Sequence, residues 1–503
     1  MSLNNDMRQN IQSNLDFSSL PTGEARMAGR EGSESLRTMS APESPATTER
    51  TMEKIVEREN LKEALRRVKA NKGAPGVDGM TVNQLDDHLK QHWPAIREQL
   101  LSGTYRPNPV KRVEIPKPDG GVRKLGIPTV LDRFIQQAVM QVLQQQWDPG
   151  FSDHSYGFRP GRSAHQAVAQ AQRHIAEGYG WVVDLDLEKF FDRVNHDRLM
   201  AQIAKRVDDK WLLKLIRAFL NAGVMENGLL SPSVEGTPQG GPLSPLLSNL
   251  VLDELDRELE HRGHRYVRYA DDCNIYVRSE RAGHRVMKSI TRFITQRLKL
   301  KVNEAKSAVA RPQERKFLGF SFTNDPEIRR AIAPKALTRF KDKIREITRQ
   351  AKGISIETTV KRLATYMVGW RGYFGFCETP EVLIGLIRWV RLRLRCALWR
   401  QWKTPRRRRA ALLQLGVRPR LAANTAGSGR GPWPVRKLYQ SELPMHTSAR
   451  SAFLHCSETT SVTSRTAVYG PVRTVVWQGS AGDCRPYADL TGKPDTDLRS
   501  FRA

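Results

Sequence analysis

The spacing of apolar residues predicts helices at both ends of the folded part of the chain. A first helix is predicted over 52–71, with Gly73 as its stop, and a second over 85–100. Residues 1–50 contain few large apolar side chains and bury too little surface to fold, so we expect a flexible leader.

Alternating apolar and polar positions mark the central strands. In the run 181–187, Val183, Leu185 and Leu187 share one face of a strand, whereas Asp184 and Asp186 share the other. Two runs rich in Val, Ile and Tyr within 265–277 flank an Ala-Asp-Asp corner, a pattern that predicts a β-hairpin with Asp271 and Asp272 at its tip. Another short hairpin is predicted over 316–322.

A further hairpin is predicted over 112–128. An Asp-Gly-Gly turn separates two β-prone runs and places Lys117 on one arm and Arg123 on the other. Two cations in this position could grip a triphosphate; an exposed basic hairpin is the alternative.

Beyond a change in composition at 324–330 the pattern becomes helical again. One predicted helix carries an apolar stripe on Leu383, Ile387, Val390, Leu394 and Ala397. A neighbouring face carries Arg388, Arg391 and Arg395, and the basic surface continues through Arg406 and Arg407, which suits contacts with phosphates. From about residue 441 the periodicity fades, and the role of 441–503 stays open.

Composition favours a polyanionic partner. The chain has 503 residues, a formal net charge of +29 and a sequence pI near 10.2. Such a surface gains affinity by displacing counterions from phosphates. A membrane would also attract it, but no apolar run is long enough to span a bilayer. Five cysteines without metal-site spacing argue against a disulfide framework or a zinc site and favour a reducing cytoplasm.

Two loops add candidate binding residues. The loop 155–163 interleaves aromatic residues and glycines with Arg159 and Arg162, a combination suited to bases and backbone phosphates. The loop 236–245 contains glycines that permit close approach of a ligand, with Gln239 as a polar handle.

The acidic residues suggest phosphoryl-transfer chemistry. Hard divalent cations prefer oxygen ligands, and two such ions can clamp the attacking and leaving oxygens. Asp271 and Asp272 need a third carboxylate, which the strand bearing Asp184 and Asp186 supplies. Acids on so apolar a strand call for a metal or a cation opposite them, or for a solvated edge.

Seven motifs in order resemble the bacterial group II intron reverse transcriptase/maturase family. They are Gly76-Val77-Asp78-Gly79, Ile115-Pro116-Lys117-Pro118, Ser155-Tyr156-Gly157-Phe158-Arg159-Pro160, Asp186 to Phe191, Thr237-Pro238-Gln239-Gly240-Gly241, Tyr269-Ala270-Asp271-Asp272 and Phe317-Leu318-Gly319-Phe320. The resemblance implies an α+β right-hand polymerase, with fingers and palm over 51–325 and a helical RNA-binding thumb or maturase domain over 326–440.

The family assigns roles to matching positions. Asp186, Asp271 and Asp272 would bind two Mg²⁺ ions, for which Mn²⁺ could substitute, and Leu187 would add its backbone carbonyl. Lys117 and Arg123 would contact the triphosphate, Gln239 would lie near the incoming nucleotide or template, and Lys306 near the phosphates. Phe191 would exclude a 2′-hydroxyl. Asp184 would be secondary.

The implied function is RNA-directed DNA synthesis combined with help in splicing. The expected partners are group II intron RNA, an RNA template, a DNA primer or target, and dNTPs, with no membrane, in a cytoplasmic ribonucleoprotein or at the nucleoid. The alternative is a splicing maturase with little polymerase activity; other types of reverse transcriptase and an RNA polymerase fit less well. Many relatives carry an endonuclease with paired Cys and His ligands. This chain shows no such cluster, so the primer is expected to come from elsewhere.

Overall fold

The computed structural model describes residues 51–116, 122–226, 229–231, 236, 240–351, 353–414 and 416–428. The predicted leader, the predicted Asp-Gly-Gly turn and the predicted tail lie outside these residues. Among the residues described, no helix combines the length and apolar character needed to cross a membrane.

The N-terminal unit consists of four helices and a small sheet. The helix predicted over 52–71 is two helices, α1 (Thr51–Ile55) and α2 (Arg58–Asn71), followed by α3 (Leu85–Leu101) and α4 (Val130–Trp147). The predicted hairpin over 112–128 is present as β1 (Val110–Pro116) and β2 (Val122–Ile127). Short strands β4 (Val224–Glu226) and β5 (Leu229–Ser231) extend this sheet in the order β2-β1-β4-β5.

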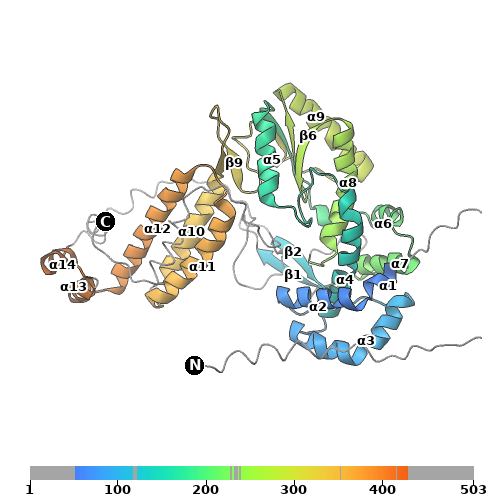
Figure 1. Ribbon diagram of the computed structural model, residues 1–503, viewed down its shortest axis with the longest axis horizontal. Helices are drawn as coiled ribbons and strands as arrows, with labels where there is room; N and C mark the ends of the chain where they lie inside the picture. Colours follow the sequence, from blue (N-terminus) through green and yellow to red (C-terminus); the bar gives the residue numbers. More distant parts are fainter. Residues whose placement is uncertain are drawn as a thin grey trace, which may run out of the picture.

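The central sheet has four antiparallel strands in the order β6-β7-β3-β8. They are β3 (Trp181–Leu185), β6 (Arg265–Tyr269), β7 (Asp272–Val277) and β8 (Ala308–Ala310). The strands are apolar where they face the core, and the helices packed around them bury that surface. The helices on the sheet are α5 (Ala164–Ala176), α8 (Ser244–His261) and α9 (Glu280–Phe293), whereas α6 (His196–Ala204) packs on α8 and α7 (Lys210–Asn221) packs on α6 and the N-terminal helices (Figure 1).

The prediction of a hairpin contained within 316–322 is wrong about which strand pairs with residues 320–322. Phe317 and Phe320 form a tight turn, with Leu318 and Gly319 at φ angles of 53° and 83°. The strand that follows, β9 (Phe320–Phe322), pairs with β10 (Arg330–Ile332) instead. The composition change at 324–330 is therefore the loop of a hairpin, and the next helix begins only at Pro334.

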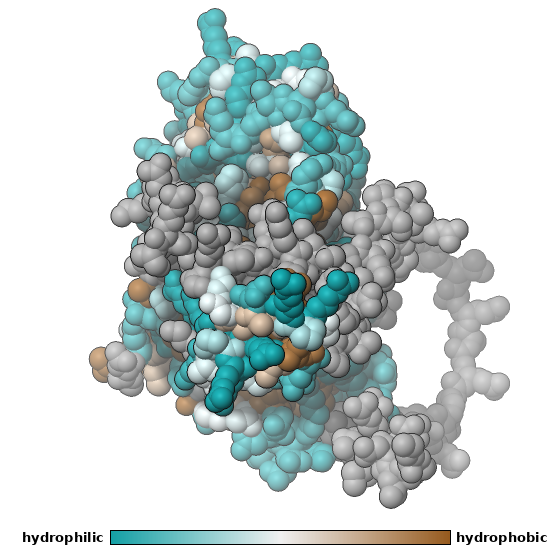
Figure 2. Space-filling view, turned by 90° about the vertical axis from the view of Figure 1, so that its left-hand side faces the viewer, coloured by the Kyte–Doolittle hydropathy of each residue, from teal (hydrophilic) through white to brown (hydrophobic). Residues whose placement is uncertain are grey.

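A separate helical domain follows. It contains α10 (Pro334–Gln350), α11 (Ile356–Phe374), α12 (Pro380–Gln401), α13 (Pro405–Gln414) and α14 (Pro419–Ala426) (Figure 1). Its core contains Val390 and Leu394 from the predicted stripe, but Leu386 is buried where Leu383 and Ile387 are only partly so. Most of the coloured residues on the side where this domain lies are hydrophilic, with smaller hydrophobic areas between them (Figure 2).

Direct contacts join the helical domain to α5 and to the turn before β9. The Tyr373 hydroxyl donates to the carbonyl oxygen of Leu318 at 2.8 Å, and the His165 ring stacks on Phe376 with centroids 4.6 Å apart. Gln172 on α5 donates to the Glu378 carboxylate at 2.8 Å. The β9-β10 hairpin and α5 therefore form a packed joint rather than a loose linker.

Candidate active site

The predicted acidic hairpin is present. Tyr269 at the end of β6 pairs with Asp272 at the start of β7, which leaves Ala270 and Asp271 as a two-residue turn. Ala270 has a φ of 57°, a left-handed conformation that costs an alanine about 1 kcal/mol or more. Surrounding contacts must therefore hold this turn in place.

Strand register brings the third acid to the same place. In the β3-β7 ladder Leu185 pairs with Cys273, so the next residue along β3, Asp186, continues toward Asp272. The backbone of Asp186 is fixed at both ends: its N–H donates to Ser307 Oγ at 3.0 Å, and its carbonyl accepts from the Asn303 N–H at 2.8 Å. The three predicted carboxylates thus lie at one end of the central sheet.

The electrostatics of this end are strongly negative. Solvent reaches Asp272, yet desolvation by the surrounding protein raises the pKa of its carboxyl group to about 8. The charges of Asp271, Asp184 and Asp186 raise this pKa further, in that order. The charge of Lys316 opposes these effects, and a bound cation would further relieve the repulsion among the carboxylates.

Asp184 has a cation of its own. Nε and Nη2 of Arg315 lie 2.9 Å and 2.5 Å from its Oδ2. Burial raises the pKa of Asp184, and the charge and hydrogen bonds of Arg315 oppose that shift. The sequence left three partners open for the acids of this strand: a metal, a cation of the protein or solvent. For Asp184 the structure shows a cation of the protein.

The carboxylate oxygens of the remaining acids are the kind of ligand that a hard divalent cation prefers. Asp186, Asp271 and Asp272 offer only oxygen ligands, as Mg²⁺ prefers. Among the residues described, no three His, Cys, Asp or Glu side chains stand together as a ready-made metal site. Lys306 Nζ lies 3.7 Å from Asp186 Oδ2, so binding a metal there would require Asp186 to exchange this cation for the ion. The side chain of Leu187 is buried in the core, which leaves only its backbone for the predicted role.

Phe191 lies one short turn beyond the acidic strand. It belongs to a 3₁₀ helix, Phe190–Asp192, and packs edge to face on buried Phe190 with centroids 5.2 Å apart. A side chain on Gly236 would place its Cβ 2.8 Å from the Phe191 carbonyl oxygen, so the loop containing Gln239 begins beside this residue. Gln239, Lys117 and the side chain of Arg123 lie outside the described residues.

The glycines of that loop approach protein rather than empty space. A Cβ on Gly240 would lie 2.4 Å from the Gly126 carbonyl oxygen, and one on Gly241 would lie 2.4 Å from Gln136 Oε1. The sequence suggested that these glycines let a ligand approach closely. At these two positions the glycines instead let the loop pack closely against β2 and α4.

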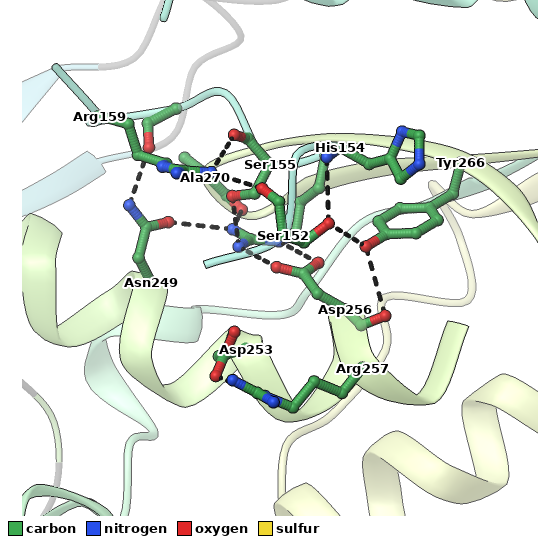
Figure 3. A network of polar contacts seen from close by, with 12 residues as sticks. Ser152, His154, Ser155, Arg159, Asn249, Asp253, Asp256, Arg257, Tyr266 and Ala270 are labelled. Atoms are coloured by element: carbon green, nitrogen blue, oxygen red, sulfur yellow. Dashed lines mark hydrogen bonds and ion pairs between the residues drawn. The ribbon is translucent and has the colours of Figure 1, made fainter. Parts of the chain in front are cut away.

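A buried arginine supports the acidic turn. Arg268 on β6 is fully buried, and Nε and Nη2 donate to the Asp256 carboxylate at 2.7 Å and 2.5 Å. Nη1 donates to the Ala270 carbonyl oxygen at 2.7 Å and to Asn249 Oδ1 at 3.1 Å. Figure 3 shows Asp256, Asn249 and Ala270 gathered in this one network.

The loop 155–163 completes the support. Ser155 Oγ accepts from Arg268 Nη2 at 2.7 Å, and the Gly157 carbonyl accepts from Asn249 Nδ2 at 2.9 Å. A Cβ on Gly157 would fall 2.2 Å from the Ala270 nitrogen, so the loop backbone lies directly against the turn. The Ser-Tyr-Gly-Phe-Arg motif thus acts at least partly through the architecture of the acidic hairpin.

The prediction that Arg159 contacts nucleic acid is wrong for the structure described. Its guanidinium is buried and donates to Asp148 Oδ1 at 2.9 Å and to the Ser155 carbonyl at 2.9 Å. Arg162 is partly exposed, but it forms an ion pair with Asp153 and lies 5.7 Å from the centroid of Tyr156. In the helical domain Arg388, Arg406 and Arg407 are exposed, whereas Arg391 and Arg395 are half-buried and have interactions within the protein.

Comparison with known proteins agrees with this geometry. A family model described as "Reverse transcriptase (RNA-dependent DNA polymerase)" matches residues 115–322, and one described as "Group II intron, maturase-specific domain" matches residues 337–415. Protein YkfC of Escherichia coli is 39% identical over 233 residues, which are 45% of this chain and 61% of YkfC. Group II intron-encoded protein LtrA of Lactococcus lactis is 40% identical over 189 residues, which are 37% of this chain and 31% of LtrA.

These matches cover only part of the known proteins, since the chain spans less than two thirds of the length of either relative. A solved structure titled "Partial Cas6-RT-Cas1--Cas2 complex" is 24% identical, covers 52% of this chain and 45% of that chain, and has a TM-score of 0.34, too low to support an argument.

Fold and site together define a right-hand polymerase fold of the reverse transcriptase class, α+β in its catalytic part and helical after it. The chain thus contains a reverse transcriptase domain followed by a group II intron maturase-specific domain, and it is similar over part of its length to a group II intron-encoded protein.

Proposed function

We propose that the chain is an RNA-directed DNA polymerase encoded by a group II intron, which also binds the intron RNA to assist splicing and copies it during intron mobility. The observation that carries the proposal is the β3-β7 register, which directs Asp186 toward Asp272 beside Asp271. Domain matches to both a reverse transcriptase and a maturase support the two halves of this function.

In the proposed reaction the 3′-hydroxyl of a DNA primer attacks the α-phosphate of a deoxynucleoside triphosphate and pyrophosphate leaves. Asp186, Asp271 and Asp272 would hold two Mg²⁺ ions, which when bound acidify the attacking hydroxyl and neutralise the leaving pyrophosphate. Lys306, Lys117 and Arg123 would bind the triphosphate. Phe191 would lie under the incoming sugar and exclude a 2′-hydroxyl.

The second candidate is a maturase that has little polymerase activity. The match of residues 337–415 to the maturase-specific domain favours it, because this region contains none of the three carboxylates. In this case the protein would stabilise the active form of the intron RNA without carrying out chemistry itself.

Two assays on one set of variants separate the candidates. Asp271→Asn and Asp272→Asn should lower primer extension on an RNA template by about a thousandfold or more, because the lost charge is needed in the transition state. Splicing of the intron RNA at low magnesium concentration should be unchanged. The control is Asp197→Asn, which alters an exposed carboxylate paired with Arg217. Primer extension at the wild-type rate in both variants would reject the polymerase.

A further inference from the structure

The end of the central sheet opposite the acids carries an aromatic and basic cluster. Trp181 begins β3, five residues before Asp186, which corresponds to about 16 Å along a strand. Val277 ends β7 opposite Trp181, and Arg265 begins β6 opposite Tyr276. We call this cluster the distal platform and define it by the residues Tyr179, Trp181, Arg265, Arg278 and Arg311.

Guanidinium groups lie over both aromatic rings of the distal platform. Arg311 Cζ is 4.3 Å from the centroid of Trp181, and Arg311 Nη1 also donates to the Gly180 carbonyl at 3.1 Å. Arg278 Cζ is 5.1 Å from the centroid of Tyr179. Arg265 and Arg278, beside the Tyr179 hydroxyl, lower the pKa of that group. All three arginines are exposed, so their outer faces are open to solvent.

Helix α9 continues this surface directly after Arg278. Its inner side packs on the sheet through Gly283, where a Cβ would lie 2.5 Å from Val309 Cγ1. Its outer side carries four exposed cations at helical spacing, Arg281, Arg285, Lys288 and Arg292, which we call the α9 ridge. None of the four forms an ion pair with a residue that the structure describes, and α9 lies on the outer side of the sheet, away from the C-terminal helices (Figure 1).

A shallow depression lies on the ridge. It is lined by Ser279, Glu280, Arg281, His284, Arg285 and Lys288. Glu280 is the one acid in this lining, and it faces His284 at 3.9 Å. The surface thus combines unneutralised cations with flat stacked groups, whereas a surface that is only solvated mixes charges of both signs.

We propose that the distal platform and the α9 ridge form a second RNA-binding surface, which holds a single-stranded segment of RNA outside the polymerase cleft. Unpaired bases stack on aromatic rings and guanidinium planes, and the ridge cations neutralise the phosphates. Double-stranded RNA fits less well, because its bases are stacked within the helix and leave the platform unused. The choice of RNA as the partner rests on the proposed function.

The test uses the full chain with a short RNA template and DNA primer bound, so that the cleft is occupied. A fluorescent oligouridylate of about 20 nucleotides then reports a second binding site. The triple variant Arg281→Ala, Arg285→Ala, Lys288→Ala should bind it about tenfold more weakly, with a salt dependence lower by about two counterions. Primer extension should stay within about twofold of wild type, because the cations that pair with the acids in the part of the chain described are Lys306, Arg315 and Lys316 rather than these three.

Two matched comparisons isolate the surface. The variant Lys72→Ala, Arg97→Ala, Lys205→Ala removes the same charge from exposed positions elsewhere and should bind the oligouridylate nearly as wild type does. Arg311→Lys keeps the charge but not the planar stack, so it should lose affinity almost as Arg311→Ala does.

Equal affinity in the ridge variant and in the Lys72, Arg97, Lys205 control would overturn the proposal, as would a parallel loss of primer extension. If wild type extends no primer while the ridge variant alone loses the second RNA, the polymerase proposal fails and this one stands.

Discussion

Arg268 Nη1 lies 2.7 Å from the carbonyl oxygen of Ala270, so a fully buried guanidinium fixes the backbone of the turn that carries Asp271. Asp256 neutralises that guanidinium from the other side. The charge pair and the strained turn therefore form one unit, in which each part can be changed separately.

Asp256→Asn should lower the free energy of unfolding by about 3 to 5 kcal/mol, because it leaves the Arg268 charge buried without a partner. The double variant Asp256→Leu, Arg268→Met removes both charges and should recover most of that stability. It also removes the hydrogen bond to Ala270, so primer extension should stay about tenfold or more below wild type. Urea unfolding and primer-extension kinetics measure the two effects; recovery of both together would show that Arg268 acts only on stability.

Gly157→Ala should displace the acidic turn, since the added Cβ would meet the Ala270 nitrogen at 2.2 Å. We expect primer extension to fall by about a hundredfold, in line with the sensitivity of catalysis to small displacements. Gly150→Ala is the matched control, because a Cβ there meets no atom within 4 Å. Similar rates for the two alanine variants would contradict the close contact between the loop and the turn.

Asp184→Asn and Asp186→Asn should differ in effect although the residues share one strand face. Asp184 is neutralised by Arg315, so its change should lower primer extension by only about tenfold, through loss of position. Asp186→Asn should lower it by about a thousandfold as a lost metal ligand. The ratio of the two rates, measured at saturating magnesium, is the readout, and a larger loss for Asp184→Asn would reverse the assignment.

Phe191→Ala should weaken discrimination against ribonucleotides. Removing a bulky ring beneath the sugar opens space for a 2′-hydroxyl, and we expect the ratio of kcat/KM for dNTP over NTP to fall by about tenfold or more. Phe190→Leu is a useful comparison, because that ring is buried in the core rather than half-exposed beside the acids. An unchanged ratio in Phe191→Ala would remove this residue from the sugar site.

Ionisation of the Asp132 carboxyl group should lower the free energy of unfolding as the pH rises from about 4 to 6. Burial raises the pKa of this carboxyl to about 6, although hydrogen bonds from Thr129 and Tyr105 oppose the shift. The folded state therefore holds the proton more tightly than the unfolded state, and up to about 3 kcal/mol of stability is lost on ionisation. Subtracting the urea stability of Asp132→Asn from that of wild type at each pH isolates this term; a difference that does not change with pH would contradict it.

Motif order and periodicity predicted the elements around the site well. The acidic hairpin was predictable because two β-prone runs enclose a turn too short for any other structure, and the alternation at 181–187 correctly separated the acids from the core face. The sequence also suggested a cation opposite the acids of this strand, although it could not point to Arg315, which is 131 residues from Asp184 in the chain.

The residues that support the turn were not predictable from local patterns. Arg268 lies within an apolar strand and Asp256 on a helix whose visible signal is its leucine stripe, so neither suggested a buried pair. The arginines in Ser-Tyr-Gly-Phe-Arg-Pro and in the 388–395 run looked alike in sequence, yet Arg159 is buried and Arg388 is exposed. Burial depends on tertiary packing, which spacing alone does not encode.

Because the hydrogen bond from Arg268 and the close packing of Gly157 hold the backbone at Ala270, we expect the acidic tip to keep its shape in metal-free solution. A chelated sample should accordingly retain its near-ultraviolet circular dichroism and regain full turnover within the mixing time once magnesium is restored, with no slow refolding phase.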